Sequence, residues 1–178
     1  MSESSELIRA LTARLDLLEA REEIRLLQQA YITGLADRNW NVMIDMFTDD
    51  AVTDITWHGE RRGRTAILDE FNKIGSMVRS RDGYVLSSPF IEVDGDKATG
   101  RFTWHRFVAD HPMPHGGLQR IWGVWQEGRY RCEYRRENGR WMFTYIHFRS
   151  VAPDPDLDAR VAAEVKEMRA RQAGSPAA

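Results

Sequence analysis

Two turn sequences in the second half of the chain constrain its fold more than any other feature. Val93-Asp94-Gly95-Asp96 and Glu137-Asn138-Gly139-Arg140 each place Asp-Gly or Asn-Gly between runs of alternating apolar and polar residues. These pairs readily adopt the positive φ angles that two-residue β-hairpin loops need. We therefore predict antiparallel sheet from about Asp82 onward. A Pro- and Gly-containing loop over 110–119 should interrupt it, and Pro153 should end the last strand.

The Asn138-Gly139 turn also predicts which side chains share a face of the sheet. If these two residues form the loop, seven side chains point the same way: Tyr130, Cys132, Tyr134, Trp141, Phe143, Tyr145 and His147. The opposite face carries Arg129, Arg131, Glu133, Arg135 and Thr144. We therefore expect one aromatic face and one charged face, the latter being a solvated surface or a wet interface.

Apolar residues in the first half recur at helical spacing, in two stripes that do not share a register. Leu7, Leu11, Leu15 and Leu18 form the first stripe, and Ile24, Leu27, Tyr31 and Leu35 form the second. The second stripe predicts a core helix over about 21–36. The first predicts an N-terminal helical arm over 1–20, exposed unless a partner covers it, and this arm is the best sequence indication of a homodimer.

The remaining elements follow from shorter signals. A second helix should carry Trp40 and Phe47 and stop at Thr48-Asp49-Asp50, a strand should cover 51–58, and Thr65 should cap a third helix. A closing helix is expected over about 157–171. We therefore predict one domain over 21–152, followed by a C-terminal helix and tail over 153–178.

Composition excludes several classes of function. The 178 residues carry 25 Lys and Arg against 27 Asp and Glu, without a basic block, which argues against a nucleic-acid partner. No apolar run approaches the roughly 18–20 residues needed to cross a bilayer, so we predict no membrane partner and a cytoplasmic location. The single cysteine, Cys132, cannot form an internal disulfide.

Six motifs occur in an order typical of one family. They are Tyr31, Trp40, the MFTDDAV segment at 46–52, Gly63-Arg64-Thr65-Ala66-Ile67, the segment from Val93 to Gly100, and Glu137-Asn138-Gly139-Arg140-Trp141. Over about 22–149 the chain resembles the SnoaL-like branch of the nuclear-transport-factor-2-like superfamily. The resemblance implies an α+β, cone-shaped fold in which three N-terminal helices pack on a strongly curved, mainly antiparallel sheet enclosing a pocket. That fold hosts several enzyme classes and plain binding domains.

Within the superfamily the chain looks most similar to the bile-acid 7α-dehydratase and scytalone dehydratase type. Those enzymes use an inward Tyr, a helix-end Asp and a strand His, with the imidazole as base. In this sequence the Tyr falls on Tyr31, whereas the Asp and His positions fall on Ala36 and Tyr84. Tyr84 could still hold a substrate oxygen, because a phenol donates a hydrogen bond well but is a weak base.

His147 and His105 are the candidate bases, with Tyr31 and Tyr84 completing the catalytic set. Each histidine also has a structural interpretation: His147 as a core residue paired with a Tyr hydroxyl, and His105 as an outer-face residue if Trp104 packs inward. Asp54 is expected outward or at an interface. The candidate substrate-binding residues are Phe102, Trp104, Trp122, Tyr130, Tyr145 and Arg149.

His111 and His115 lie in the Pro/Gly loop, where little holds them rigidly, so we predict no metal. The same loop is long enough to act as a lid. The sequence thus favours a cofactor-free lyase or isomerase acting on a hydrophobic, oxygenated polycyclic or aromatic molecule. The alternative is a non-catalytic binding or accessory domain of the same fold, which the residues at Ala36 and Tyr84 favour.

Overall fold

A computed structural model describes residues 3–56, 58–77, 83–112, 118–151 and 166, with side chains described except at 75–77 and 107–125. This part contains three helices: α1 (Glu3–Asp37), α2 (Trp40–Ile44) and α3 (Arg64–Met77). It also contains six strands: β1 (Phe47–Ile55), β2 (Glu60–Arg62), β3 (Gly83–Asp94), β4 (Lys97–Pro112), β5 (Leu118–Glu137) and β6 (Arg140–Ser150). The predicted closing helix and the tip of the predicted lid lie outside the described residues.

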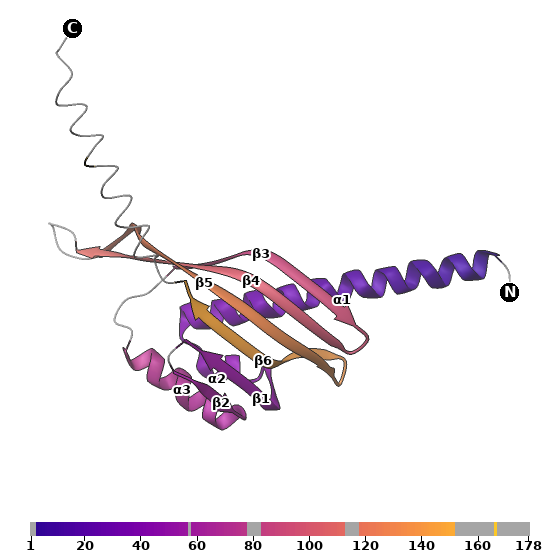
Figure 1. Cartoon of the computed structure of the whole chain (residues 1–178), viewed down its shortest axis with the longest axis horizontal. Coiled ribbons are helices and arrows are strands. Elements are labelled where there is room, and N and C mark those ends of the chain that lie inside the picture. The colour runs from indigo at the N-terminus through magenta and orange to yellow at the C-terminus, as the bar shows by residue number, and fades with distance from the viewer. Residues whose placement is uncertain (1–2, 57, 78–82, 113–117, 152–165, 167–178) are drawn as a thin grey trace, which may run out of the picture.

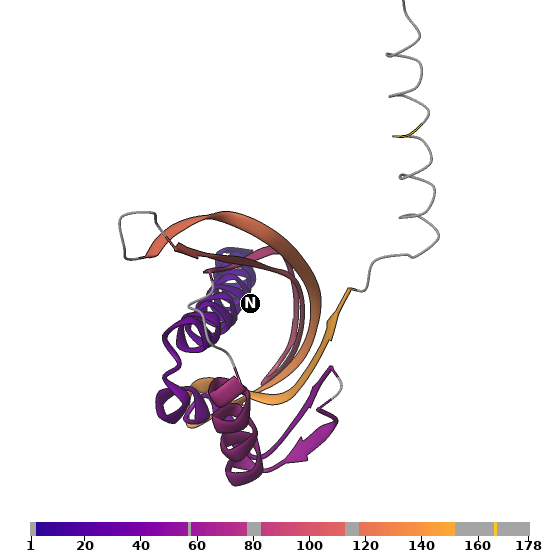
Figure 2. The same cartoon turned by 90° about the vertical axis from the view of Figure 1, so that its left-hand side faces the viewer.

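The six strands form one curved sheet in the order β2-β1-β6-β5-β4-β3. All neighbouring pairs are antiparallel except β1 and β6, which are parallel. The sheet curls around α1, which lies on its concave side, while α2 and α3 lie against the β1 and β2 end (Figures 1 and 2). The predicted α+β architecture, with N-terminal helices on a strongly curved, mainly antiparallel sheet, is confirmed.

Both predicted hairpins are present. Asp94 pairs with Lys97 around Gly95, and Glu137 pairs with Arg140 around Asn138-Gly139. Asn138 and Gly139 have φ angles of 51° and 77°, as a two-residue hairpin loop of mirror-image type requires. The predicted 110–119 loop is wrong at its two ends, because β4 continues to Pro112 and β5 begins at Leu118.

A β-bulge in β6 makes part of the predicted register wrong. Tyr134 pairs with Phe143 as expected, but the next residue of β5, Glu133, pairs with Tyr145, so Thr144 is an extra residue in β6. One inserted residue exchanges the faces of every residue beyond it. Ile146 and Phe148 are therefore buried against α1, and Tyr145 and His147 lie on the outer, convex face.

Helix α1 combines the predicted arm and core helix without a break. Its buried residues are Ala20, Ile24, Gln28, Tyr31, Ile32 and Gly34. The leucines of the first stripe are 52–60% exposed, and Figure 1 shows that the N-terminal half of α1 extends beyond the sheet. In the single chain, the described part of the predicted arm is therefore a helix with an exposed apolar stripe.

The second helix is shorter than predicted and the first strand is longer. Helix α2 ends at Ile44, and β1 begins at Phe47 rather than at 51. The cause is tertiary: Phe47 pairs with Phe143 of β6, and the Phe143 N–H donates to the Met46 carbonyl at 2.8 Å. The sequence near Phe47 is compatible with either state, and pairing with β6 selects the strand.

The main core lies between α1, α3 and the sheet. The Tyr31 ring contacts the rings of Phe47, Phe71 and Phe143, with centroids 5.4–6.2 Å apart, distances typical of tilted and edge-on aromatic pairs. None of the helices in the described part combines the length and apolar character needed to cross a bilayer.

Candidate functional site

Five aromatic rings line the concave side of the sheet and form a continuous series, called here the inner ring row. Its members, in order of contact, are Tyr84 on β3, Trp104 on β4, Phe148 on β6, Tyr130 on β5 and Tyr31 on α1. Tyr84 stacks on Trp104 with centroids 5.5 Å apart, and Trp104 meets Phe148 edge-on at 5.1 Å. The row runs from half-buried Tyr84 on the edge strand to Tyr31, which is 1% exposed.

Gly128 explains how a ring of β4 reaches a ring of β6 across the intervening strand. It lies on β5 opposite Trp104 and has no side chain. A Cβ atom placed there would lie 2.4 Å from the Phe148 ring and 3.1 Å from the Trp104 ring. The two rings therefore occupy the volume that any other residue at 128 would fill.

Tyr31 and Tyr130, the two buried phenols of the row, are neutral hydrogen-bonding groups at physiological pH. Burial, reinforced by the nearby Cys132 side chain, raises the pKa of Tyr31 above its ordinary value, and burial and Tyr31 raise that of Tyr130. A hydrogen bond links these two phenols. Burial also raises the pKa of Cys132 to about 12. None of these groups is a base at pH 7.

A buried amide continues the polar side of the core. Gln28 on α1 is fully buried, and its Oε1 accepts hydrogen bonds from the Tyr134 hydroxyl at 2.8 Å and the Cys132 thiol at 3.6 Å. Its Nε2 has no hydrogen-bond partner in the part of the chain that the structure describes. The Trp104 indole Nε1 is likewise buried and, among the described residues, without a partner. These two groups are among the buried donors that have no hydrogen-bond partner in the described part of the chain.

Both histidines predicted as bases lie on the outer side of the sheet. His147 is moved there by the bulge at Thr144, so its predicted place on the aromatic face is wrong. His105 alternates with Trp104, which is 7% exposed and faces inward, and the His105 Nε2 lies 3.3 Å from the Ser87 hydroxyl. The expectation that an inward Trp104 places His105 outside is confirmed.

Asp54, His147 and Arg149 form a charged cluster on the outer face. The Arg149 guanidinium binds the Asp54 carboxylate at 2.6 Å and the Asp54 backbone carbonyl at 3.0 Å, which holds the pKa of Asp54 below its ordinary value. The His147 Nε2 lies 3.9 Å from the same carboxylate, too far for a hydrogen bond. Partial burial, and then Arg149, lower the pKa of His147 despite the Asp54 charge. His147 is therefore neutral at pH 7.

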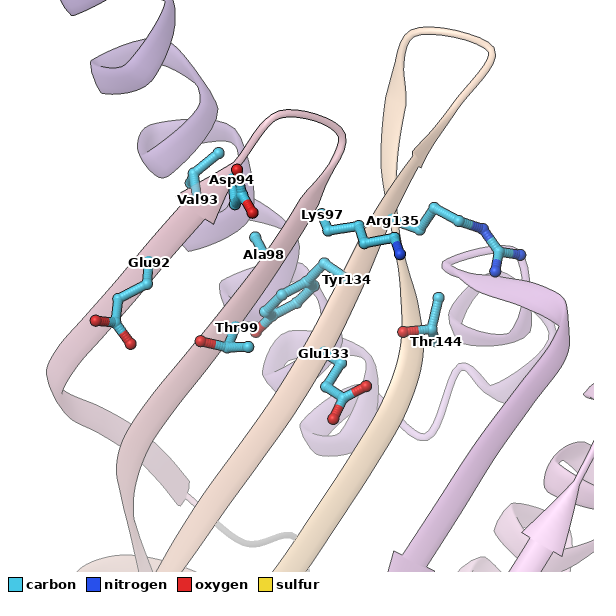
Figure 3. A pocket seen from close by; sticks show the side chains of 10 residues that line it. All are labelled: Glu92, Val93, Asp94, Lys97, Ala98, Thr99, Glu133, Tyr134, Arg135 and Thr144. Atoms are coloured by element: carbon cyan, nitrogen blue, oxygen red, sulfur yellow. The ribbon is translucent and has the colours of Figure 1, made fainter.

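Two surface hollows of about 580 and 590 Å³ lie on the outer face and share Glu92, Thr99 and Glu133. Figure 3 shows the first, close to the two hairpins, where Glu133 and Thr144 extend from the sheet away from the helices. The second includes Tyr145 and His147. Both hollows contain acidic and basic side chains, in agreement with the mixed charged face predicted from the sequence. The hollows are therefore separate from the inner ring row.

The predicted site residues thus divide between two faces. The inner face holds Tyr31, Tyr84, Phe102, Trp104 and Tyr130, and the outer face holds His105, Tyr145, His147 and Arg149. The Trp122 side chain lies outside the described set. Sequence reasoning missed Phe148, Gln28 and Gly128. Of these three, only Gln28 could have been found from the sequence, because a polar residue four positions after Ile24 falls on the predicted buried stripe.

A second ion-pair cluster lies at the β1–β2 turn. Glu70 of α3 is 3% exposed, and its carboxylate binds His58 Nδ1 at 2.7 Å and Arg61 Nε at 2.9 Å. These contacts tie β2 and the turn before it to α3. Among the described residues, no group of three or more His, Cys, Asp and Glu side chains is arranged to hold a metal ion.

Comparisons with known proteins agree with this architecture. A search of the curated proteins finds no match. Among solved structures, an NTF2-like protein with a cystatin-like fold from Novosphingobium aromaticivorans superposes with a TM-score of 0.65 and 22% identity, covering 84% of this chain and 93% of that one. The hexachlorocyclohexane dehydrochlorinase LinA-type3 from Novosphingobium barchaimii gives 0.64 and 23% identity, covering 78% and 91%.

A third similar structure, from Novosphingobium aromaticivorans and provisionally assigned as a scytalone dehydratase, gives a TM-score of 0.62 and 17% identity, covering 79% of this chain and 89% of that one. At these identities the likeness shows the fold alone. The model of the SnoaL-like domain matches residues 16–147, which include every member of the inner ring row except Phe148. The chain therefore belongs to the SnoaL-like domain family.

Proposed function

We propose that the chain binds a hydrophobic, ring-containing small molecule with hydrogen-bond-accepting oxygens at the Tyr84 and Trp104 end of the inner ring row. The observation that carries the proposal is the character of the groups there. They are flat aromatic faces and neutral donors, whereas both candidate imidazole bases lie on the opposite side of the sheet. Such a surface recognises a ligand without removing a proton from it.

Trp104 is the central contact in this proposal. Its ring stacks on Tyr84, and its buried Nε1–H has no partner among the described residues. An unpaired buried donor is costly, and a ligand oxygen that accepts from it recovers this cost. Tyr84 is half-buried, so its phenol can donate to a second ligand oxygen, in the position where the dehydratase type carries a histidine.

The test is calorimetric titration of the full chain with a panel of steroid-like and polyketide-like ketones and alcohols. Trp104→Phe keeps a ring and removes the N–H, and should weaken binding about three- to tenfold, the net value of one hydrogen bond. Trp141→Phe is the matched control, because Trp141 is also buried and its Nε1 also lacks a partner in the described part of the chain. Equal affinities for the two variants, or no ligand in the panel, would refute the proposal.

The second candidate is a lyase or isomerase that binds its substrate at the same end of the inner ring row. It is favoured by the similarity of the fold to a hexachlorocyclohexane dehydrochlorinase. Mass spectrometry of each ligand after overnight incubation separates the candidates. Elimination or isomerisation that depends on Tyr31 or Tyr84 would establish the enzyme, whereas ligands recovered unchanged at full occupancy would establish the binding protein.

A further inference from the structure

The N-terminal arm, residues 3–20 of α1, exposes a row of large apolar side chains. Leu7, Ile8, Leu11, Leu15 and Leu18 are 52–64% exposed. An isolated helix of this length is only marginally stable in water, and most helices gain their stability by covering an apolar face. The arm therefore has the composition of a helix whose apolar face packs against another helix or another surface.

The spacing of these residues is that of a two-stranded coiled coil. Ile8, Leu11, Leu15 and Leu18 are separated by three, four and three residues, so Ile8 and Leu15 are a positions, and Leu11 and Leu18 are d positions. The next a and d positions are Glu22 and Arg25, which bind each other at 2.7 Å. The apolar seam thus ends where α1 reaches the sheet.

The seam faces away from the domain over most of its length, and only its last position, Leu18, shares a surface hollow with Pro89, Phe90 and Ile91 of β3. At about 100° per residue, the centre of the seam lies about 150° around the helix axis from the centre of the buried face that includes Ile24, Gln28 and Tyr31. A second helix laid along the seam therefore meets the domain to which the arm belongs only at the Leu18 end, beside Phe90 of β3. Under two-fold symmetry the two domains lie on opposite outer sides of the paired arms.

We propose that the arm pairs in parallel with the arm of a second copy of this chain. The charged residues beside the seam favour a second copy of the same helix as the partner and a parallel orientation of the two helices. Arg14 is a g position and Glu19 is the following e position. In a parallel pair each Arg14 meets Glu19 of the other copy, which gives two ion pairs across the seam. An antiparallel pair that aligns Leu11 with Leu15 places the two Arg14 side chains against each other instead.

A cysteine substitution tests the direction directly. In a parallel pair Ile8 faces its own copy, so Ile8→Cys should form a disulfide-linked dimer under mild oxidation. The native Cys132 is 2% exposed and does not compete. In an antiparallel pair Ile8 faces Leu18, so cross-linking only between Ile8→Cys and Leu18→Cys chains would overturn the proposed direction.

Sedimentation equilibrium of the full chain tests the pairing itself. Arg14→Glu and Glu19→Arg should each weaken the dimer about three- to thirtyfold, and an equimolar mixture of the two should form a heterodimer that restores both ion pairs. Leu11→Asp should yield monomer, whereas the control Val42→Asp, on equally exposed Val42 of α2, should not.

A wild-type chain that is monomeric at every concentration would overturn the proposal. It would indicate that a different partner, or the C-terminal segment of the same chain, covers the seam. A dimer that survives Leu11→Asp unchanged would also overturn it, because the contact would then lie elsewhere. Neither result bears on ligand binding at the inner ring row.

Discussion

Substituting Gly128 with alanine is the sharpest probe of the inner ring row. The added methyl group would lie 2.4 Å from two atoms of the Phe148 ring and 3.1 Å from Trp104. The Phe148 ring cannot simply swing aside, because Tyr130 lies 4.5 Å from it and Trp104 lies 5.1 Å from it, centroid to centroid. The methyl group must therefore displace several rings together.

The expected cost follows from this overpacking. An extra methyl group in a well-packed core typically lowers the free energy of unfolding by about 1–3 kcal/mol. Part of this loss is offset because alanine has less conformational entropy than glycine in the unfolded state. For a chain of this length, 1 kcal/mol corresponds to roughly 2–4 °C in Tm. We therefore expect Gly128→Ala to lower Tm by about 2–10 °C, measured by calorimetry.

Gly100→Ala is the matched control, because its methyl group would lie 2.7 Å from the Phe102 ring and 2.9 Å from the Tyr134 hydroxyl. Both variants should lose stability to a similar extent, but only Gly128→Ala should weaken binding of a ligand to Trp104. A Gly128→Ala protein as stable as the wild type would refute the packing argument. Equal loss of ligand affinity in both variants would refute the placement of the ligand.

Three further outcomes are expected. Tyr134→Phe removes the 2.8 Å hydrogen bond to Gln28 and should cost about 1–3 kcal/mol in urea unfolding; an unchanged midpoint would contradict this. Partial burial and Arg149 lower the pKa of His147 in the folded state, so the free energy of unfolding should fall as pH drops through the ordinary histidine range. His147→Gln should make this pH dependence flatter between about pH 7.5 and 5.5. An identical slope in the variant and the wild type would contradict this role of His147. Deleting Thr144 removes the extra residue, leaves Tyr145 opposite Glu133 in an unbulged ladder and keeps Ile146 and Phe148 inward, so Tm should change by only a few °C; a loss of several kcal/mol, the cost of turning both side chains outward at about 1.5–3 kcal/mol each, would contradict the assignment of Thr144 as the extra residue.

Local sequence determined the elements whose signals are contained within a few residues. The Asp-Gly and Asn-Gly turns specify the β3–β4 and β5–β6 hairpins because those pairs tolerate positive φ. The two stripes of α1 specify a long helix with an exposed N-terminal half. Alternation along β4 places Phe102 and Trp104 on the inner face. These features need no knowledge of a distant partner.

The tertiary structure decided which face the last strand presents. Beyond Thr144, either register puts an aromatic residue inside: Tyr145 with His147, or Ile146 with Phe148. Burying Ile146 and Phe148 leaves no polar group to be satisfied, whereas burying a phenol and an imidazole requires partners inside the core. The bulge at Thr144 allows Ile146 and Phe148 to be the buried pair. A bulge cannot be recognised from strict alternation along the sequence, because alternation assumes that no residue is inserted. For that reason the sequence could predict four members of the inner ring row: Tyr31, Tyr84, Trp104 and Tyr130. That Phe148 is the fifth member, and that His147 lies on the other face, depends on how β6 pairs with β1 and β5.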